Sequence, residues 1–466
     1  MAVYKFKTKP DPYQRDALIR AIKLKRFGVF FQQRVGKTKT AIDFIGALHV
    51  GKGFTRFIVS CPAGAEGVWS EQLKEHLGYS YSFVPLPQTD KARAKFADTR
   101  PDRLTILCVS HDTLYTALKH LQKWNPQAVI FDEIHAMKDP TTKRSRAAYK
   151  LVKDLDYVLG LTGTPIPKRP LDVFGIWKVL RPEVFGTSIT KFRDQYCIMG
   201  GFMGKEVIGY KNTSELSRKI SEYSIRVLRK DIMEEPKVEY VVVPVDLEPS
   251  ARELYNDLKK TFIAELNEHE RVTADVAGVR IMRLQQLCGG FLPVDSSDPD
   301  EKKLVQVSSA KKTLALNLIQ NIIEQDEKVV VFFRFVAELE LMANELAKKG
   351  IPALMLYGKT PKKSRDAIIS SFQNDSYYKV ILVQEHVGSM GISLDAAHIN
   401  IYYSMTYSLL DFQQSRDRVM GRGQTKDVTN YLLAIRDSVD YKIVQTLKND
   451  EDLSTSISDK WRWLMD

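Results

Sequence analysis

Two stretches of this chain alternate short apolar runs with amphipathic helical patterns, and this alternation limits the fold more than any other feature. In the first stretch the runs are four or five residues long and rich in β-branched or aromatic side chains. They fall at 27–31, 57–61, 105–109, 128–131 and 157–161. Buried strands separated by helices predict a parallel sheet that is covered by helices on both faces.

The alternation resumes in the last third of the chain. Its strand candidates lie at 328–333, 353–357, 378–383, 399–403 and 429–434. Between the two stretches the pattern is mainly helical, with one extended run at 237–245 and a segment rich in Asp, Ser and Pro, Pro293–Lys303, that predicts a linker or exposed loop. The sequence thus predicts an α/β protein of two parallel-sheet lobes. We place the lobes at 1–185 and 301–450, a helical insertion and bridge at 186–300, and a C-terminal tail at 451–466.

Composition excludes several classes of protein. Hydrophobic residues make up 44% and charged residues 27% of the 466 residues, which is typical of globular chains and not of fibrous or disordered ones. No apolar run approaches the roughly 18 residues that a membrane span needs, so no membrane partner is expected. The four cysteines are scattered and form no C-x-x-C pair, which favours a reducing compartment, and we expect the cytoplasm.

The charge balance points to a polyanionic partner. Lys and Arg number 69 and Asp and Glu 57, which gives a formal net charge of +12. A surplus of this size favours nucleic acid, although an evenly spread positive surface would give the same sum.

One of the strand-to-helix junctions resembles a phosphate-binding loop. After the run at 27–31, Gly36-Lys37-Thr38 opens a helical pattern. In such loops backbone N–H groups and a helix N-terminus hold phosphates, the lysine reaches the β/γ oxygens and the threonine binds Mg²⁺. The first glycine of the full pattern is absent, because Phe31 stands in its place. An ordinary turn with a surface lysine therefore stays an alternative for this segment.

A second junction carries two adjacent carboxylates. The apolar run at 128–131 ends in Asp132 and Glu133. Acidic residues at the carboxyl end of such a strand face the crevice where α/β sheets bind ligands. One carboxylate can hold Mg²⁺ while the next orients and deprotonates a water, and nucleotide hydrolysis needs both roles. A solvated loop is the alternative, and the presence of Lys37 upstream argues against it.

The ordered set of motifs resembles the Swi/Snf branch of the superfamily-two helicases. Asp132-Glu-Ile-His135 is similar to the D-E-x-H box of that superfamily. The other matching segments, in family order, are 161–167, 179–186, 228–231, 246–255, 283–288, 328–335, 388–394, 414–418 and 423–426. The resemblance runs from Tyr13 to Leu447, and it implies two RecA-like lobes with ATP in the cleft between them. It also implies DNA-stimulated ATP hydrolysis coupled to translocation along duplex DNA.

The resemblance assigns roles to the residues at matching positions. Those expected to act on the nucleotide are Gln14 for adenine, Gly36 and Lys37 for the phosphates, Thr38 and Asp132 for Mg²⁺, Glu133 as general base, and Gln414, Arg418 and Arg422 for the γ-phosphate. Those expected to contact the DNA backbone are Ser60, Cys61 and Ser110, and those expected to couple the ATP state to the grip on DNA are Thr162, Thr164 and Gly391. Trp69 is interpreted as a packing residue and not as a platform for base stacking.

Three departures from the family pattern bear on these assignments. Arg34 stands where a glycine is usual two positions before Gly36, and Gly421 stands where the second arginine of the sixth motif is usual, with Arg422 one place later. Residues 384–386 are Gln, Glu and His where small polar and basic residues are usual. A DNA-binding module with an impaired ATP site therefore remains a hypothesis.

Two further activities remain open from the sequence. One is a strand-separating or branch-migrating DNA helicase in replication, recombination or repair, since a separating wedge has no sequence signature. The other is an enzyme directed at RNA, whose grooves and 2′-hydroxyls differ from those of duplex DNA. ATP, Mg²⁺ and duplex DNA are the expected ligands, with duplex favoured over single strands or RNA, and the sequence identifies no protein partner.

Overall fold

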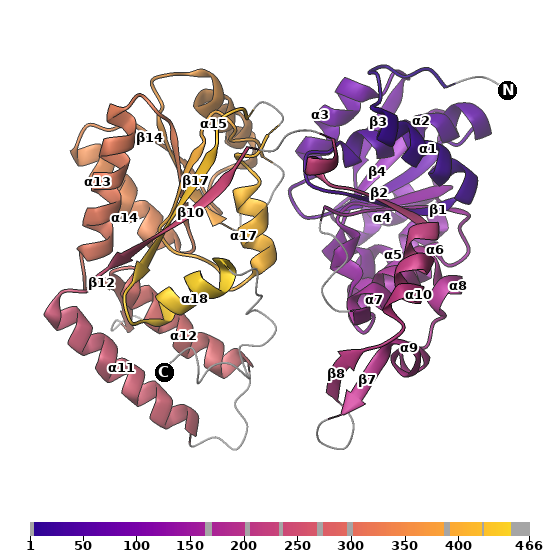
Figure 1. The fold of residues 1–466 in the computed structure, drawn as a ribbon. Coiled ribbons are helices and arrows are strands. Elements are labelled where there is room, and N and C mark those ends of the chain that lie inside the picture. The colour runs from indigo at the N-terminus through magenta and orange to yellow at the C-terminus, as the bar shows by residue number, and fades with distance from the viewer. Residues whose placement is uncertain are drawn as a thin grey trace. The chain divides into compact units, whose positions relative to one another are not determined.

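The computed structural model describes residues 4–163, 170–200, 206–232, 236–267, 274–295, 302–385, 392–421 and 424–448. The chain divides into two compact units, Met1–Glu235 and Pro236–Asp466. Each unit is built on one parallel sheet (Figure 1). Among the described residues, no helix combines the length and the apolar character needed to cross a membrane.

The first unit contains a seven-stranded parallel sheet in the order β3-β4-β2-β5-β6-β1-β9. Its strands are β1 (Arg26–Phe31), β2 (Arg56–Cys61), β3 (Tyr81–Pro85), β4 (Leu104–Ser110), β5 (Ala128–Phe131), β6 (Tyr157–Leu161) and β9 (Ser224–Val227). All five strands predicted in this part of the chain are confirmed. Strands β2, β5, β6 and β1 are parallel neighbours in that order. The loops after β1, β5 and β6 therefore all start from the carboxyl ends of the strands, at the same end of the sheet.

Helices cover both faces of this sheet because successive strand residues face opposite ways. In β2, Phe57 and Val59 pack with α1, α2 and α3, while Ile58 packs with the helices of the other face. The helices are α1 (Pro12–Leu24), α2 (Lys37–Lys52), α3 (Glu66–His76), α4 (Asp90–Ala97), α5 (Leu114–Trp124), α6 (Lys143–Val152), α7 (Pro170–Leu180), α8 (Pro182–Phe185), α9 (Ile189–Tyr196) and α10 (Thr213–Glu222). Strands buried on both faces explain why the sequence shows continuous apolar runs there.

The second unit contains a six-stranded parallel sheet in the order β10-β17-β16-β13-β15-β14. Its strands are β10 (Val238–Val245), β13 (Val329–Phe333), β14 (Ala353–Leu356), β15 (Val380–Gln384), β16 (Ile399–Tyr402) and β17 (Val428–Ile435). These six correspond to the five strands predicted for the second lobe and to the extended run at 237–245. The prediction of two parallel-sheet α/β lobes is therefore confirmed.

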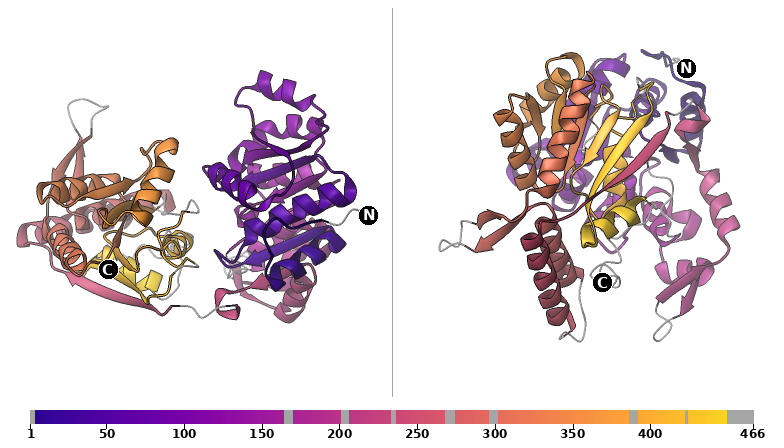
Figure 2. Two further views of the ribbon diagram at one scale, coloured as in Figure 1. Left: turned by 90° about the horizontal axis from the view of Figure 1, so that it is seen from above. Right: turned by 60° about the vertical axis from the view of Figure 1, so that its left-hand side comes forward.

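Helices also cover both faces of the second sheet. Helices α13 and α14 pack on one face, whereas α12, α15, α17 and α18 contribute to the core on the other (Figures 1 and 2). The helices of this unit are α11 (Pro249–Asn267), α12 (Ala274–Cys288), α13 (Ala310–Glu324), α14 (Val336–Lys348), α15 (Lys362–Asn374), α17 (Leu409–Arg416) and α18 (Val439–Lys448).

The region between the predicted lobes contributes to both sheets. Within 186–300, β9 pairs with β1 in the first unit and β10 pairs with β17 in the second. Strands β7 (Cys197–Gly200) and β8 (Glu206–Tyr210) add an antiparallel hairpin to the first unit (Figure 1). The linker predicted at 293–303 is partly wrong, because β11 (Phe291–Asp295) and β12 (Lys302–Gln306) form an antiparallel pair there. Main-chain hydrogen bonds between β11 and β12 stabilise extended structure in parts of this segment, although its Asp, Ser and Pro residues favour turns.

Candidate functional site

The phosphate-loop residues join β1 to α2. Gly36 is the N-cap of α2 and has a φ of 84°, which lies in the left-handed region that glycine adopts at little cost. Arg34 also has a positive φ, 65°. The glycine that the family pattern places at this position would hold the same backbone with less strain. Lys37 and Thr38 follow as the first residues of α2, where the N-terminus of the helix favours anions.

The Lys37 side chain folds back over the loop. Its Nζ donates to the Phe31 carbonyl oxygen at 3.2 Å, and the residue is buried. A Cβ atom on Gly163, in the loop after β6, would lie only 2.8 Å from Nζ. Gly163 thus permits the close approach of the lysine, and any larger residue would displace it.

The acidic pair follows β5 at the same edge of the sheet. The Asp132 N–H donates to the Ser60 carbonyl oxygen at 2.7 Å, which extends the pairing of β5 with β2 by one residue. Glu133 then takes a φ of 52°, so the chain turns sharply and Oε2 accepts from the Gly163 N–H at 3.4 Å. Lys37 and Glu133 therefore both lie against Gly163.

The two carboxylates have pKa values shifted in opposite directions. Burial raises the pKa of Asp132, and the neighbouring Glu133 carboxylate raises it further. Burial also disfavours ionised Glu133, but the Lys37 ammonium and the hydrogen bond with His135 outweigh it and hold the pKa of Glu133 below its usual range. The pair thus offers one firmly ionised carboxylate and a second one, Asp132, that a nearby cation would stabilise in its charged form.

His135 and Thr162 complete a cluster around Glu133. His135 Nδ1 lies 3.2 Å from Glu133 Oε2 and 3.1 Å from Thr162 Oγ1. The Thr162 hydroxyl is also 3.4 Å from the same carboxylate oxygen. The loops after β5 and β6 are therefore joined by side chains. Thr164 lies outside the described residues.

Two residues that the sequence did not assign to the site, Trp69 and His111, contact Asp132. Trp69 Nε1 on α3 donates to Asp132 Oδ2 at 2.8 Å. His111 Nε2, directly after β4, lies 2.8 Å from the Asp132 carbonyl oxygen, and its Nδ1 lies 2.8 Å from Ser60 Oγ. The earlier interpretation of Trp69 as packing alone is incomplete.

Gln14 lies beside the phosphate loop. Its Nε2 is 3.4 Å from the Val35 carbonyl oxygen, and its Oε1 accepts from the Asp11 N–H at 2.9 Å. The neighbouring Tyr13 hydroxyl donates to the same Val35 carbonyl at 3.1 Å. The start of α1 is thus tied by hydrogen bonds to the loop that leads into Lys37.

The three residues assigned to the DNA backbone differ in exposure. The side chains of Ser60 and Cys61 are buried, Ser60 against His111 and Cys61 with its Sγ 3.6 Å from Cys108 Sγ. Ser110 is half-buried and its Oγ lies 3.0 Å from Thr113 Oγ1. Of the three, only Ser110 has a partly accessible side chain in this structure.

In the second unit, Gln414 lies on α17 and Arg418 lies just after it. Both side chains are largely buried. The Arg418 carbonyl oxygen accepts from the Leu394 N–H at 2.9 Å, which joins the sixth motif to the end of the fifth. Arg422 and Gly391 lie outside the described residues.

Glu385 explains one departure from the family pattern. It is buried directly after β15, and its Oε2 accepts from the Thr406 N–H at 2.7 Å. Burial raises the pKa of Glu385 to about 8. The side chain therefore takes part in the interior of the unit and is not presented to a nucleic acid.

The donor set of the first unit fits a magnesium–nucleotide complex. Within the described ranges, no three His, Cys, Asp or Glu side chains gather as a metal cage. Mg²⁺ does not require such a cage, because it usually binds one or two protein oxygens, substrate phosphates and water. The Asp132 carboxylate and the Thr38 hydroxyl are hard oxygen donors of the kind that it prefers.

Comparison with known proteins identifies the family. Residues 32–290 match the family model of the SNF2-related domain, which is more than half of the chain. The chain belongs to the SNF2-related family. Residues 311–423, within the second unit of this SNF2-related chain, match the helicase conserved C-terminal domain. The resemblance to the Swi/Snf branch is confirmed.

Individual relatives of this SNF2-related chain are distant. An uncharacterized ATP-dependent helicase of Mycoplasma genitalium is 23% identical over 95% of this chain and 41% of its own length. A Caenorhabditis elegans homolog of the SWI/SNF-related matrix-associated actin-dependent regulator of chromatin subfamily A-like protein 1 is 26% identical over 93% of this chain and 60% of its own. The chain thus spans less than two thirds of the length of these curated relatives.

One solved structure similar to the SNF2-related chain is the Sulfolobus solfataricus SWI2/SNF2 ATPase core in complex with dsDNA. It is 22% identical, and the match covers 100% of this chain and 96% of that chain with a TM-score of 0.46.

Proposed function

We propose that this chain is a DNA-dependent ATPase that couples ATP hydrolysis to translocation along duplex DNA. The observation that carries the proposal is the convergence of Lys37 and Glu133 on Gly163, with Asp132 beside them. A cation for phosphates, a base for water and a carboxylate for a metal ion are the parts that phosphoryl transfer to water requires. Membership of the SNF2-related family supports the same conclusion.

In the proposed mechanism Lys37 and the N-terminus of α2 hold the phosphates, and Gln14 lies at the adenine. Thr38 and Asp132 hold Mg²⁺, which neutralises charge on the phosphate oxygens when it is bound. Glu133 orients the attacking water and accepts its proton. Once phosphates take up the charge of Lys37, the pKa of Glu133 rises toward its ordinary value, which makes Glu133 a stronger base.

The second unit supplies the remaining groups in this proposal. Gln414 and Arg418 act on the γ-phosphate, with Arg422 contributing, and an arginine in this role stabilises the charge that develops in the transition state. Ser110 contacts a DNA strand, while Thr162, Thr164 and Gly391 link the ATP state to the hold on DNA.

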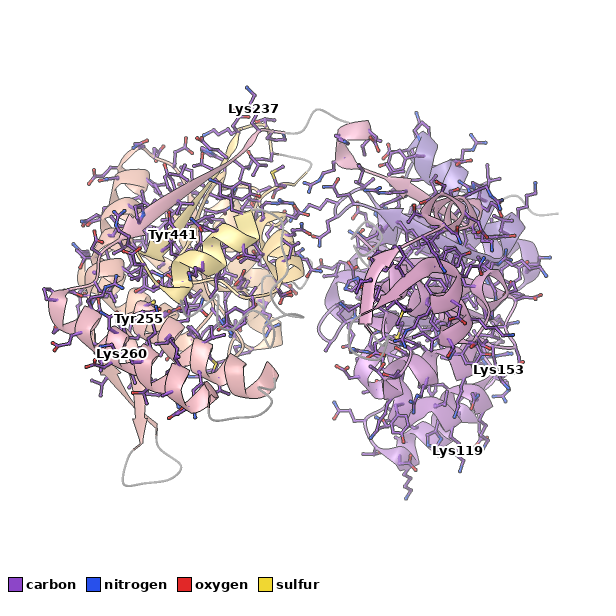
Figure 3. The ribbon with its side chains drawn as sticks, turned by 60° about the horizontal axis from the view of Figure 1, so that its bottom comes forward. Lys119, Lys153, Lys237, Tyr255, Lys260 and Tyr441 are labelled. Atoms are coloured by element: carbon purple, nitrogen blue, oxygen red, sulfur yellow. The ribbon has the colours of Figure 1, made fainter. Side chains whose placement is uncertain are left out.

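Surface charge is compatible with a DNA partner. Exposed lysines such as Lys119 and Lys153 on the first unit and Lys260 on the second extend from their helices or loops (Figure 3). Lysines of this kind attract phosphates without reading sequence. We expect binding that depends strongly on salt and little on sequence.

A triplex-displacement assay tests translocation directly. A third strand bound to a duplex is released when a motor moves along the duplex beneath it. We expect ATP-dependent release that requires duplex leading to the triplex. ATP hydrolysis stimulated by DNA but without release of the third strand would contradict coupling and leave a DNA-dependent ATPase alone.

One feature favours the alternative of a strand-separating helicase. Ile198 and Ile208 on the β7–β8 hairpin are 44% and 65% exposed, which is high for large apolar side chains. Apolar side chains on a narrow element can wedge between bases and unstack them. A gel assay on forked and four-way DNA distinguishes the alternatives, because a pure translocase leaves the strands paired.

A further inference from the structure

Asp132 is held at two of its atoms by residues that lie far from it in the sequence. Trp69 Nε1 donates to the side-chain oxygen Oδ2, and His111 Nε2 lies at hydrogen-bond distance from the main-chain carbonyl, each at 2.8 Å. We propose that Trp69 and His111 are positioning residues that aim the Asp132 carboxylate at the metal ion of the bound nucleotide. The inference rests on the proposed function of Asp132 as a metal ligand.

The Trp69 ring can act as a fixed support. It lies on α3, is only 1% exposed and belongs to the hydrophobic core that also contains residues of α1, α2 and the sheet. A ring enclosed in this way keeps its N–H in one direction. Its hydrogen bond to Oδ2 therefore limits rotation of the carboxylate about the Cβ–Cγ bond, so the direction of Oδ1 is also set.

The His111 ring has only one tautomer that satisfies both of its neighbours. A carbonyl oxygen can only accept, so Nε2 carries the hydrogen and donates to Asp132. The unprotonated Nδ1 then accepts from the Ser60 hydroxyl at 2.8 Å. Ser60, assigned from the motif to DNA, has the role here of fixing the histidine.

Repulsion between two neighbouring carboxylates explains why Asp132 needs such support. Asp132 and Glu133 are adjacent, half-buried carboxylates, and their negative charges repel each other. An unsupported Asp132 carboxylate would relieve the repulsion by rotating away. A hydrogen bond to Oδ2 favours the charged form in one orientation. Partners of metal-binding side chains in other proteins typically contribute about 10–100-fold to metal affinity.

The test is Mn²⁺ binding to the full chain together with a non-hydrolysable ATP analogue, measured by electron paramagnetic resonance. Trp69→Phe removes the N–H but keeps an aromatic ring. The matched control is Trp124→Phe, because Trp124 is equally buried in the same unit and its Nε1 has no hydrogen-bond partner within the described part of the chain. His111→Phe removes the hydrogen bond to the Asp132 carbonyl oxygen, and its Mn²⁺ binding is measured in the same assay.

We expect Mn²⁺ to bind about 10-fold or more weakly to Trp69→Phe than to wild type, with metal-free nucleotide binding unchanged. In steady state the Mg²⁺ concentration for half-maximal hydrolysis should rise more than the KM for ATP. Trp124→Phe should match wild type in both. Equal Mn²⁺ binding by Trp69→Phe and Trp124→Phe would overturn the inference, whereas a wild type that binds no Mn²⁺ with nucleotide would overturn the proposed function itself.

Discussion

Replacing Lys37 by alanine is expected to reduce ATP hydrolysis to background. The ammonium lies against Gly163 and beside Glu133, and it is the cationic side chain assigned to the β/γ oxygens. Loss of one such donor to a transition state typically costs about 10²–10³ in kcat. Steady-state phosphate release measures the loss, and a filter-binding assay should show duplex DNA affinity near that of wild type.

Lys52→Ala is the matched control for this prediction. Lys52 ends the same helix, α2, and is exposed, so its removal should leave hydrolysis unchanged. Thermal unfolding of both variants checks that the first unit remains folded. If Lys37→Ala hydrolysed ATP at a rate within a few fold of wild type, the assignment of this loop to the ATP phosphates would be wrong.

Replacing Arg418 by alanine is expected to cause the second large loss. An arginine that stabilises charge on a transferring phosphoryl group is worth about 10³–10⁵ in rate. Because this interaction strengthens in the transition state, kcat should fall while the KM for ATP changes little. Single-turnover kinetics on the full chain separate the chemical step from ATP binding.

Two further variants and one control test this prediction. Arg418 is only 4% exposed, so truncation could disturb the second unit, and Arg418→Lys retains the charge without the guanidinium fork. Arg422→Ala should cause a smaller but measurable fall in kcat. The exposed Arg436→Ala serves as a control. A normal single-turnover rate in Arg418→Lys and Arg418→Ala would show that Arg418 does not act on the γ-phosphate.

Most strands of the two sheets were predictable because they are buried on both faces. Continuous apolar runs such as those of β1 and β13 stand out from their surroundings. The missed strands lack that signal: β3 is only partly buried, and β9 is an edge strand containing Ser224 and Arg226. Hairpins β7–β8 and β11–β12 were missed because their pairing depends on the main chain more than on side-chain pattern.

The candidate site was most predictable where its residues follow strands closely. Asp132 and Glu133 come directly after β5 and Lys37 opens the helix after β1, so the fold class alone brings them to the carboxyl ends of neighbouring strands. The contact of Trp69 with Asp132 spans 63 positions of sequence and depends on how α3 packs. For His111 the sequence offered one weak signal of a place in the site. His111 directly follows β4, the neighbour of β2, so it lies at the same end of the sheet as Asp132.

Steady-state ATP hydrolysis with and without nucleic acid tests the central claim most directly. The rates of the full chain are compared without nucleic acid and with single-stranded DNA, duplex DNA or RNA, with Glu133→Gln measured in parallel. We predict strong stimulation by duplex DNA that is absent in Glu133→Gln. A rate that stays flat with every nucleic acid would contradict the account and favour a binding module in which Arg34 and Gly421 impair hydrolysis.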